Sequence, residues 1–171
     1  KNIFDGIDTS WNRVKGGSAI GTLVAEVEKN FDFKNPSASI PSLVKIYQEI
    51  QKLEDTHWKI IKTEEVKKII AGCAGLYLEA VAESQSITPG SELSVKIEAT
   101  NRSSQPMIFK SLTTNPRVTI PFKETSLENN KAFYSDIKIS LPENLEYTAP
   151  YWLKEPGTVG MYKVTDQTKI G

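Results

Sequence analysis

The chain has 171 residues, enough for one compact domain or two small ones. Hydrophobic residues make up 39% and charged residues 25%, the usage of ordinary globular proteins, which argues against extensive disorder. Lys+Arg and Asp+Glu each number 21, so no positive excess exists to neutralise phosphates, and a nucleic-acid partner is not expected. Apolar runs are only a few residues long, so no membrane span is expected.

The N-terminal half of the chain shows helical periodicity. After an opening loop over residues 1–17, apolar residues recur at the spacing of one helical face over about 18–30, 39–55 and 63–81. Three amphipathic helices packed together are therefore expected, the third capped by Thr63. Gly72 and Gly75 fall inside the third helix, where each costs about 1 kcal/mol relative to Ala, so we expect another backbone to approach them closely.

The pattern changes near residue 88, and we expect one domain over 1–88 and a second over 89–171. After Pro89-Gly90, Leu93, Val95, Ile97 and Ala99 alternate with polar residues, which predicts a half-buried strand. Further strands are expected at about 107–112, 117–120, 132–140 and 159–165, separated by turn residues. The predicted fold class is α+β, with a three-helix segment followed by a small antiparallel immunoglobulin-like β-sandwich, incomplete or resting partly on the helices.

Residues that carry catalytic chemistry are few. His57 is the single histidine and Cys73 the single cysteine, so a zinc site built on several imidazoles is excluded. We expect His57 to lie in the loop between the second and third helices, and Cys73 to be buried packing in a helix rather than a thiolate nucleophile. No catalytic residue, cofactor site or metal site is therefore assigned in this chain.

Aromatic residues beside polar groups are the better candidates for a contact surface. Trp11 lies in a polar stretch, and Tyr151-Trp152 follows a proline between predicted strands. Such rings serve either as buried anchors or as platforms for sugars. We expect both tryptophans to be largely buried anchors, Trp11 against the helices and Trp152 at the junction with the sandwich.

One longer pattern covers nearly the whole chain. It begins with DGIDTSWNRVKGG at residues 5–17 and continues through the stretches 39–43, 55–59, 73–80, 89–90, 101–103 and 150–153. This pattern resembles the region downstream of the catalytic domain in large PIG-L (LmbE-like) deacetylases of Bacteroidetes-type bacteria. None of the matching stretches is a catalytic motif.

The resemblance implies a parent enzyme that removes N-acetyl groups from amino sugars with a catalytic zinc. The zinc ligands of that family lie in a His-Pro-Asp-Asp type motif and a later histidine pair, neither of which occurs here. The resemblance also implies an extracytoplasmic parent, periplasmic or secreted. The chain begins at Lys1 without Met and stops after a strand-like stretch, so we expect it to be a fragment of a longer protein.

The leading hypothesis is a non-catalytic accessory region whose partner is the catalytic domain of the parent chain, which would hold the zinc, with glycan as a second candidate partner. The alternative is a stand-alone carbohydrate- or protein-binding module, and an enzyme in its own right is disfavoured. The candidate glycan or interface contacts are Trp11, Arg13, Trp58, Tyr151 and Trp152.

Overall fold

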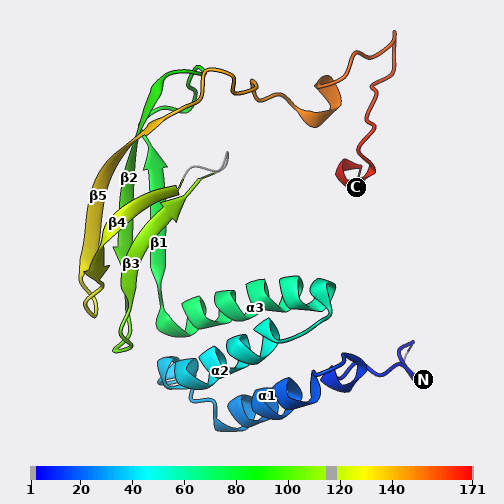
Figure 1. Cartoon of the computed structure of the whole chain (residues 1–171), viewed down its shortest axis with the longest axis vertical. Helices are drawn as coiled ribbons and strands as arrows, with labels where there is room; N and C mark the ends of the chain where they lie inside the picture. Colours follow the sequence, from blue (N-terminus) through cyan, green and yellow to red (C-terminus); the bar gives the residue numbers. More distant parts are fainter. Residues whose placement is uncertain (1–2, 115–118, 171) are drawn as a thin grey trace. The chain divides into compact units, whose positions relative to one another are not determined.

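The computed structural model describes residues 3–114 and 119–170. Three α-helices come first, five β-strands follow, and short 3-10 helices occur at both ends of this described part (Figure 1). The helices are α1 (Ser18–Asn30), α2 (Ile40–Gln51) and α3 (Thr56–Ala74). The strands are β1 (Tyr77–Ala82), β2 (Glu92–Thr100), β3 (Ile108–Thr113), β4 (Thr119–Ser126) and β5 (Ala132–Ser140). The α+β class with antiparallel sheets is confirmed.

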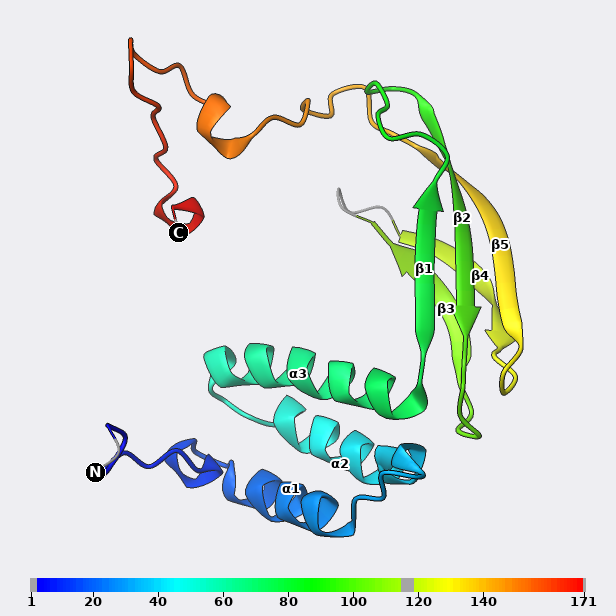
Figure 2. The ribbon, with the colours of Figure 1, turned by 180° about the vertical axis from the view of Figure 1, so that it is seen from behind.

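The helices form one layer around α2. Both views show α2 between α1 and α3, and the seven buried core residues of this layer come from the helices and their connections (Figures 1 and 2). These core residues are Val14, Ile20, Leu43, Ile46, Ile50, Leu53 and Val66. Ile20 and Ile50 are the most completely buried of them, and burying each side chain stabilises the fold by about 1.5–3 kcal/mol.

The third helix begins and ends earlier than its periodicity predicts. It starts at Thr56 because the Asp55 side chain accepts a hydrogen bond from the Trp58 N–H at 3.1 Å and caps the first turn. It ends at Ala74 because Gly75 adopts a left-handed conformation with φ +57°. Thr63, predicted as the N-cap, lies inside α3 and accepts a hydrogen bond from the Gln51 side chain at 2.7 Å.

Three expectations tied to this helix are wrong. His57 lies in the first turn of α3 rather than in a loop, and residues 77–82 form strand β1 rather than helix. Gly72 has no neighbour close to the position of a Cβ, so no second backbone approaches it. A Cβ on Gly75 would lie 3.1 Å from the Cβ of Arg102, so here the close neighbour is a side chain.

The strands form two separate sheets. The three-stranded sheet has the order β1-β2-β5, and β3 pairs with β4 as an antiparallel hairpin in the register Ile108↔Ser126 to Thr113↔Thr119. The alternation predicted for β2 is confirmed, since Val95, Ile97 and Ala99 are all buried. The sheets do not close on each other.

Two of the predicted strands do not correspond fully to observed strands. The strand expected at about 117–120 begins in residues outside the described part of the chain, and β4 begins at Thr119. The strand expected at 159–165 is absent from the structure, where Thr158 and Met161 instead form an isolated antiparallel bridge across a tight turn. Gly160 at φ +86° makes that turn possible.

The residues group into two compact units. The helical unit comprises Lys1–Ala80 and Ile97–Ser135, and the C-terminal unit comprises Val81–Lys96 and Asp136–Gly171. The boundary expected between residues 88 and 89 stays a prediction. In the part of the chain that the structure describes, no helix is long and apolar enough to cross a bilayer.

Candidate binding site

The turn before Trp11 is held by local hydrogen bonds. Asp8 Oδ1 accepts from the Ser10 N–H at 2.8 Å, and Ser10 Oγ accepts from the Asn12 N–H at 3.2 Å, which starts the short 3-10 helix Trp11–Arg13. Hydrogen bonds from the hydroxyl and the N–H of Ser10 lower the pKa of Asp8 below its ordinary value. The Asp8 carboxylate therefore stays charged while it fixes the turn.

Two glycines allow Trp11 to lie against the helical layer. A Cβ on Gly17 would lie 2.3 Å from the backbone oxygen of Trp11, and a Cβ on Gly21 would lie 3.3 Å from the Trp11 Cβ. The tryptophan is half-buried and packs against the helical core. Its backbone and ring thus occupy space that any larger residue at Gly17 would take.

Helix α3 brings a second tryptophan to the same place. The guanidinium carbon of Arg13 lies 4.2 Å from the centroid of the Trp58 ring, and Lys62 Nζ lies 5.8 Å from it. Both distances are within the range of a cation–π contact. Lys62 follows Trp58 by one helical turn, so the two side chains share a face of α3. Three candidate contacts, Trp11, Arg13 and Trp58, are therefore close together.

A small hollow of about 190 Å³ opens among these residues. The rings of Trp11 and Trp58, the cations of Arg13 and Lys62, and the hydroxyl residues Thr9 and Ser10 line it. Pockets for whole small molecules usually measure about 300–1,000 Å³, so this hollow has room for one chemical group only.

Tyr151 and Trp152 lie in the C-terminal unit and contact each other. Their ring centroids are 4.9 Å apart in an edge-to-face arrangement. The expectation that Trp152 is largely buried is wrong, since 41% of its surface is exposed. It follows Pro150 in a segment whose other apolar side chains, such as Leu153 and Met161, are themselves largely exposed. Trp152 also lines a hollow of about 590 Å³ together with Met161 and Tyr162.

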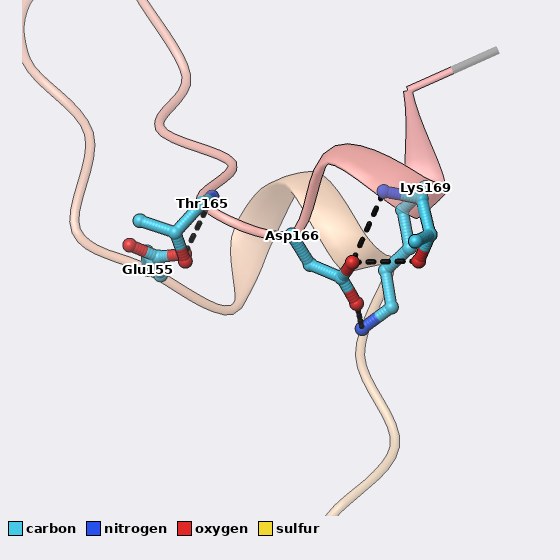
Figure 3. A network of polar contacts seen from close by, with 5 residues as sticks. Glu155, Thr165, Asp166 and Lys169 are labelled. Atoms are coloured by element: carbon cyan, nitrogen blue, oxygen red, sulfur yellow. Dashed lines mark hydrogen bonds and ion pairs between the residues drawn. The ribbon is translucent and has the colours of Figure 1, made fainter.

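A polar network at the end of the chain fixes the segment that carries this hollow (Figure 3). Glu155 Oε1 accepts hydrogen bonds from the Thr165 N–H at 3.0 Å and from its hydroxyl at 2.5 Å. Asp166 accepts from the N–H and hydroxyl of Thr168 and pairs with Lys169 Nζ at 3.2 Å. Hydrogen bonds from these threonines lower the pKa of both carboxyl groups, which keeps them charged acceptors. The network has a structural role at the surface of the protein.

Cys73 and His57 do not have the environment of a catalytic pair. Cys73 is half-buried and packs against the helical core, and burial raises the pKa of its thiol, opposite to what a thiolate nucleophile needs. His57 is exposed, and its ring meets that of Trp58 edge-to-face with centroids 5.1 Å apart. Among the described residues, no three His, Cys, Asp or Glu side chains gather where they could hold a metal ion.

The helical layer also carries an apolar groove of about 310 Å³. Val24 and Val27 of α1 line one side, Ile46 of α2 lies at the middle, and Val66 and Ile69 of α3 line the other side. The groove lies between α1 and α3, which both pack on α2, and its deeper side chains, such as Ile46 and Val66, are buried.

Lys62, Thr9 and Ser10 were not predicted as site residues. The signal for Lys62 was the spacing of one helical turn from Trp58, which only becomes informative once Asp55 is recognised as the N-cap of α3. No family model, curated protein or solved structure matches this chain.

Proposed function

We propose that this chain is a non-catalytic accessory region of a larger enzyme, and that its helical layer packs on a neighbouring domain. The apolar groove between α1 and α3 carries the proposal. Ile69 at its edge is 51% exposed, while Ile46 and Val66 deeper in the groove are buried, and an apolar groove with an exposed apolar side chain at its edge offers a surface on which another protein domain can pack. The chemistry of the site residues supports binding rather than catalysis.

The resemblance to PIG-L (LmbE-like) deacetylases suggests which enzyme that is. In this proposal the neighbouring domain is the catalytic domain of an N-acetyl amino-sugar deacetylase, which holds the zinc through its own histidines and aspartates. The parent then acts outside the cytoplasm. This chain orients the catalytic domain and supplies no catalytic group.

The strands are proposed to belong to an immunoglobulin-like sandwich. Phe109 of β3 supports this because its ring lies 4.9 Å from that of Phe122 on β4 and 5.2 Å from that of Phe133 on β5. Aromatic contact between residues of two different sheets is the packing that a sandwich core requires.

The second candidate function is a stand-alone module that binds carbohydrate or protein. One observation favours it: the hollow beside Trp152 has a volume of about 590 Å³, within the usual range of small-molecule pockets of about 300–1,000 Å³. Titration of the chain with oligosaccharides tests this function directly. Binding that Trp152→Ala abolishes without lowering the melting temperature supports the module.

Two experiments test the accessory role. The DNA upstream of the Lys1 codon should encode a domain with a His-Pro-Asp-Asp type motif in the same reading frame, and an ordinary start codon at that place contradicts the proposal. The second experiment measures binding between this chain and the separately expressed catalytic domain.

The docking experiment has a matched control on the same helix. Ile69→Lys places a charge at the edge of the groove and should weaken docking about tenfold or more, since burying an unpaired charge at an interface costs several kcal/mol. Ile60→Lys makes the same change at a residue of α3 that is 60% exposed and does not line the groove, and should leave docking unchanged. Equal affinity of the two variants would place the interface elsewhere.

A further inference from the structure

Among the described residues, the guanidinium of Arg13, which lines the hollow beside Trp58, has no carboxylate partner in an ion pair. In the part of the chain that the structure describes, Arg13 makes no ion pair within 4.0 Å, although nine such pairs form elsewhere. The Asp8 carboxylate interacts with Arg13 electrostatically, but it already accepts a hydrogen bond from Ser10. Of the causes that act on the pKa of Asp8, the Arg13 charge is the weakest. The Arg13 charge is therefore available to an external anion.

The contact with Trp58 prepares this guanidinium for binding. Its five N–H donors form a rigid planar fork, and its central carbon lies over the Trp58 ring at 4.2 Å from the centroid, so the ring contact positions the fork that an acceptor would meet. Holding the side chain in place also reduces the entropy that it loses when a ligand binds. An exposed arginine without such a ring contact would lack this advantage.

The charges around the hollow favour a singly charged anion. Lys62 adds a second cation on the same ring, but it is paired with Glu65 at 2.7 Å, and the Asp8 carboxylate is near enough to Arg13 for that charge to lower its pKa. Two cations and two carboxylates give the hollow a net charge of about zero, so a doubly charged phosphate gains no general attraction and meets two carboxylates nearby. A carboxylate matches the guanidinium fork with two parallel hydrogen bonds and carries one charge.

We propose that the hollow formed by Arg13, Trp58 and Lys62 is a binding site for a carboxylate, presented by an acidic sugar. The volume of about 190 Å³ takes the carboxylate, the residues Thr9 and Ser10 line its polar side, and Trp11 lines it with an apolar ring that can meet C–H groups. This site goes beyond the proposed accessory role and does not rest on it, because Arg13 and Trp58 line the hollow and not the groove between α1 and α3.

The test is a titration of the intact chain followed through the indole N–H signal of Trp58 by NMR. The probes are glucuronate, glucose and acetate. Glucuronate should shift the Trp58 signal saturably, and its affinity should fall several-fold between about 0.05 M and about 0.5 M salt because exposed charges are screened. Glucose should not bind. Affinity for glucuronate above that for acetate supports an acidic sugar as the ligand, whereas equal affinities would mean that the sugar ring is not recognised and would contradict it.

Variants separate this site from general surface charge. Arg13→Gln should weaken glucuronate binding about tenfold, the effect of losing hydrogen bonds to a charged group. Lys15→Gln is the matched control, because it removes a positive charge two residues away whose partner is Glu54 at 2.9 Å, and it should bind as the wild type does. Arg13→Lys keeps the charge without the fork and should fall between the two, which also covers the case in which Arg13→Gln lowers the melting temperature.

Three further results would overturn the proposal. These are equal binding of glucose and glucuronate, undiminished binding by Arg13→Gln, and no shift of the Trp58 signal with any of the three probes.

Discussion

Trp11 and Trp152 look alike in the sequence, since each is a tryptophan in a polar stretch, but their surroundings differ. Trp11 packs against the helical core and against Gly17 and Gly21, whereas the Trp152 ring meets that of Tyr151 and is 41% exposed. Replacing a half-buried ring leaves apolar neighbours without contacts, and replacing an exposed ring changes little. The two residues should therefore separate in a stability measurement.

We expect Trp11→Ala to lower the free energy of unfolding by about 2–3 kcal/mol, somewhat less than for a fully buried tryptophan. Trp152→Ala serves as the matched control and should change it by less than about 0.5 kcal/mol, as for other surface substitutions. Urea unfolding of both variants, followed by circular dichroism, measures the difference. A loss for Trp152→Ala as large as that for Trp11→Ala would mean that the segment around Trp152 is held against the rest of the chain.

Helix α3 is the element whose ends are set by particular side chains. Asp55 caps its first turn, and Gly75 ends it in a left-handed conformation at φ +57°. Its two glycines therefore have opposite roles: Gly72 lies within the helix with open space around it, while Gly75 terminates it. The same substitution should have opposite effects at the two positions.

Gly72→Ala should raise the free energy of unfolding by about 0.5–1 kcal/mol, because alanine restricts the unfolded chain and favours helix. Gly75→Ala should lower it by about 1–2 kcal/mol, because an L-residue is strained in the left-handed region and the new Cβ would press on Arg102 at 3.1 Å. Thermal melts of the two variants beside the wild type provide the measurement. A stabilising Gly75→Ala would mean that α3 does not end where the structure places its terminus.

For the molecule as a whole, the single histidine and single cysteine limit its chemistry. A catalytic zinc takes three protein ligands, most often imidazoles or a mixture with carboxylates and thiolates. We therefore expect the purified chain to hold no stoichiometric zinc and to release no acetate from N-acetylglucosamine derivatives. Elemental analysis after dialysis and an acetate-release assay check this, and one tightly held zinc per chain would contradict it.

The sequence by itself determined the features that depend on neighbours along the chain. The apolar spacing of α1, the alternation in β2 and the order of helices before strands follow from local periodicity, and these predictions are confirmed. The end of α3 is also set by a local signal, the glycine at position 75. The apolar spacing continues past it through residues 77–81, however, and therefore predicts helix where the structure has strand β1. The resemblance to deacetylases remains a prediction.

Only the tertiary structure decided which side chains share a site. Arg13 and Trp58 come from separate segments that meet because both flank the same helical core, and no periodicity in either segment encodes that contact. The exposure of Trp152 could not be predicted from the sequence either, because the burial of a ring depends on which distant residues pack against it. Spacing along a chain fixes the face of an element, whereas packing between elements fixes what that face meets.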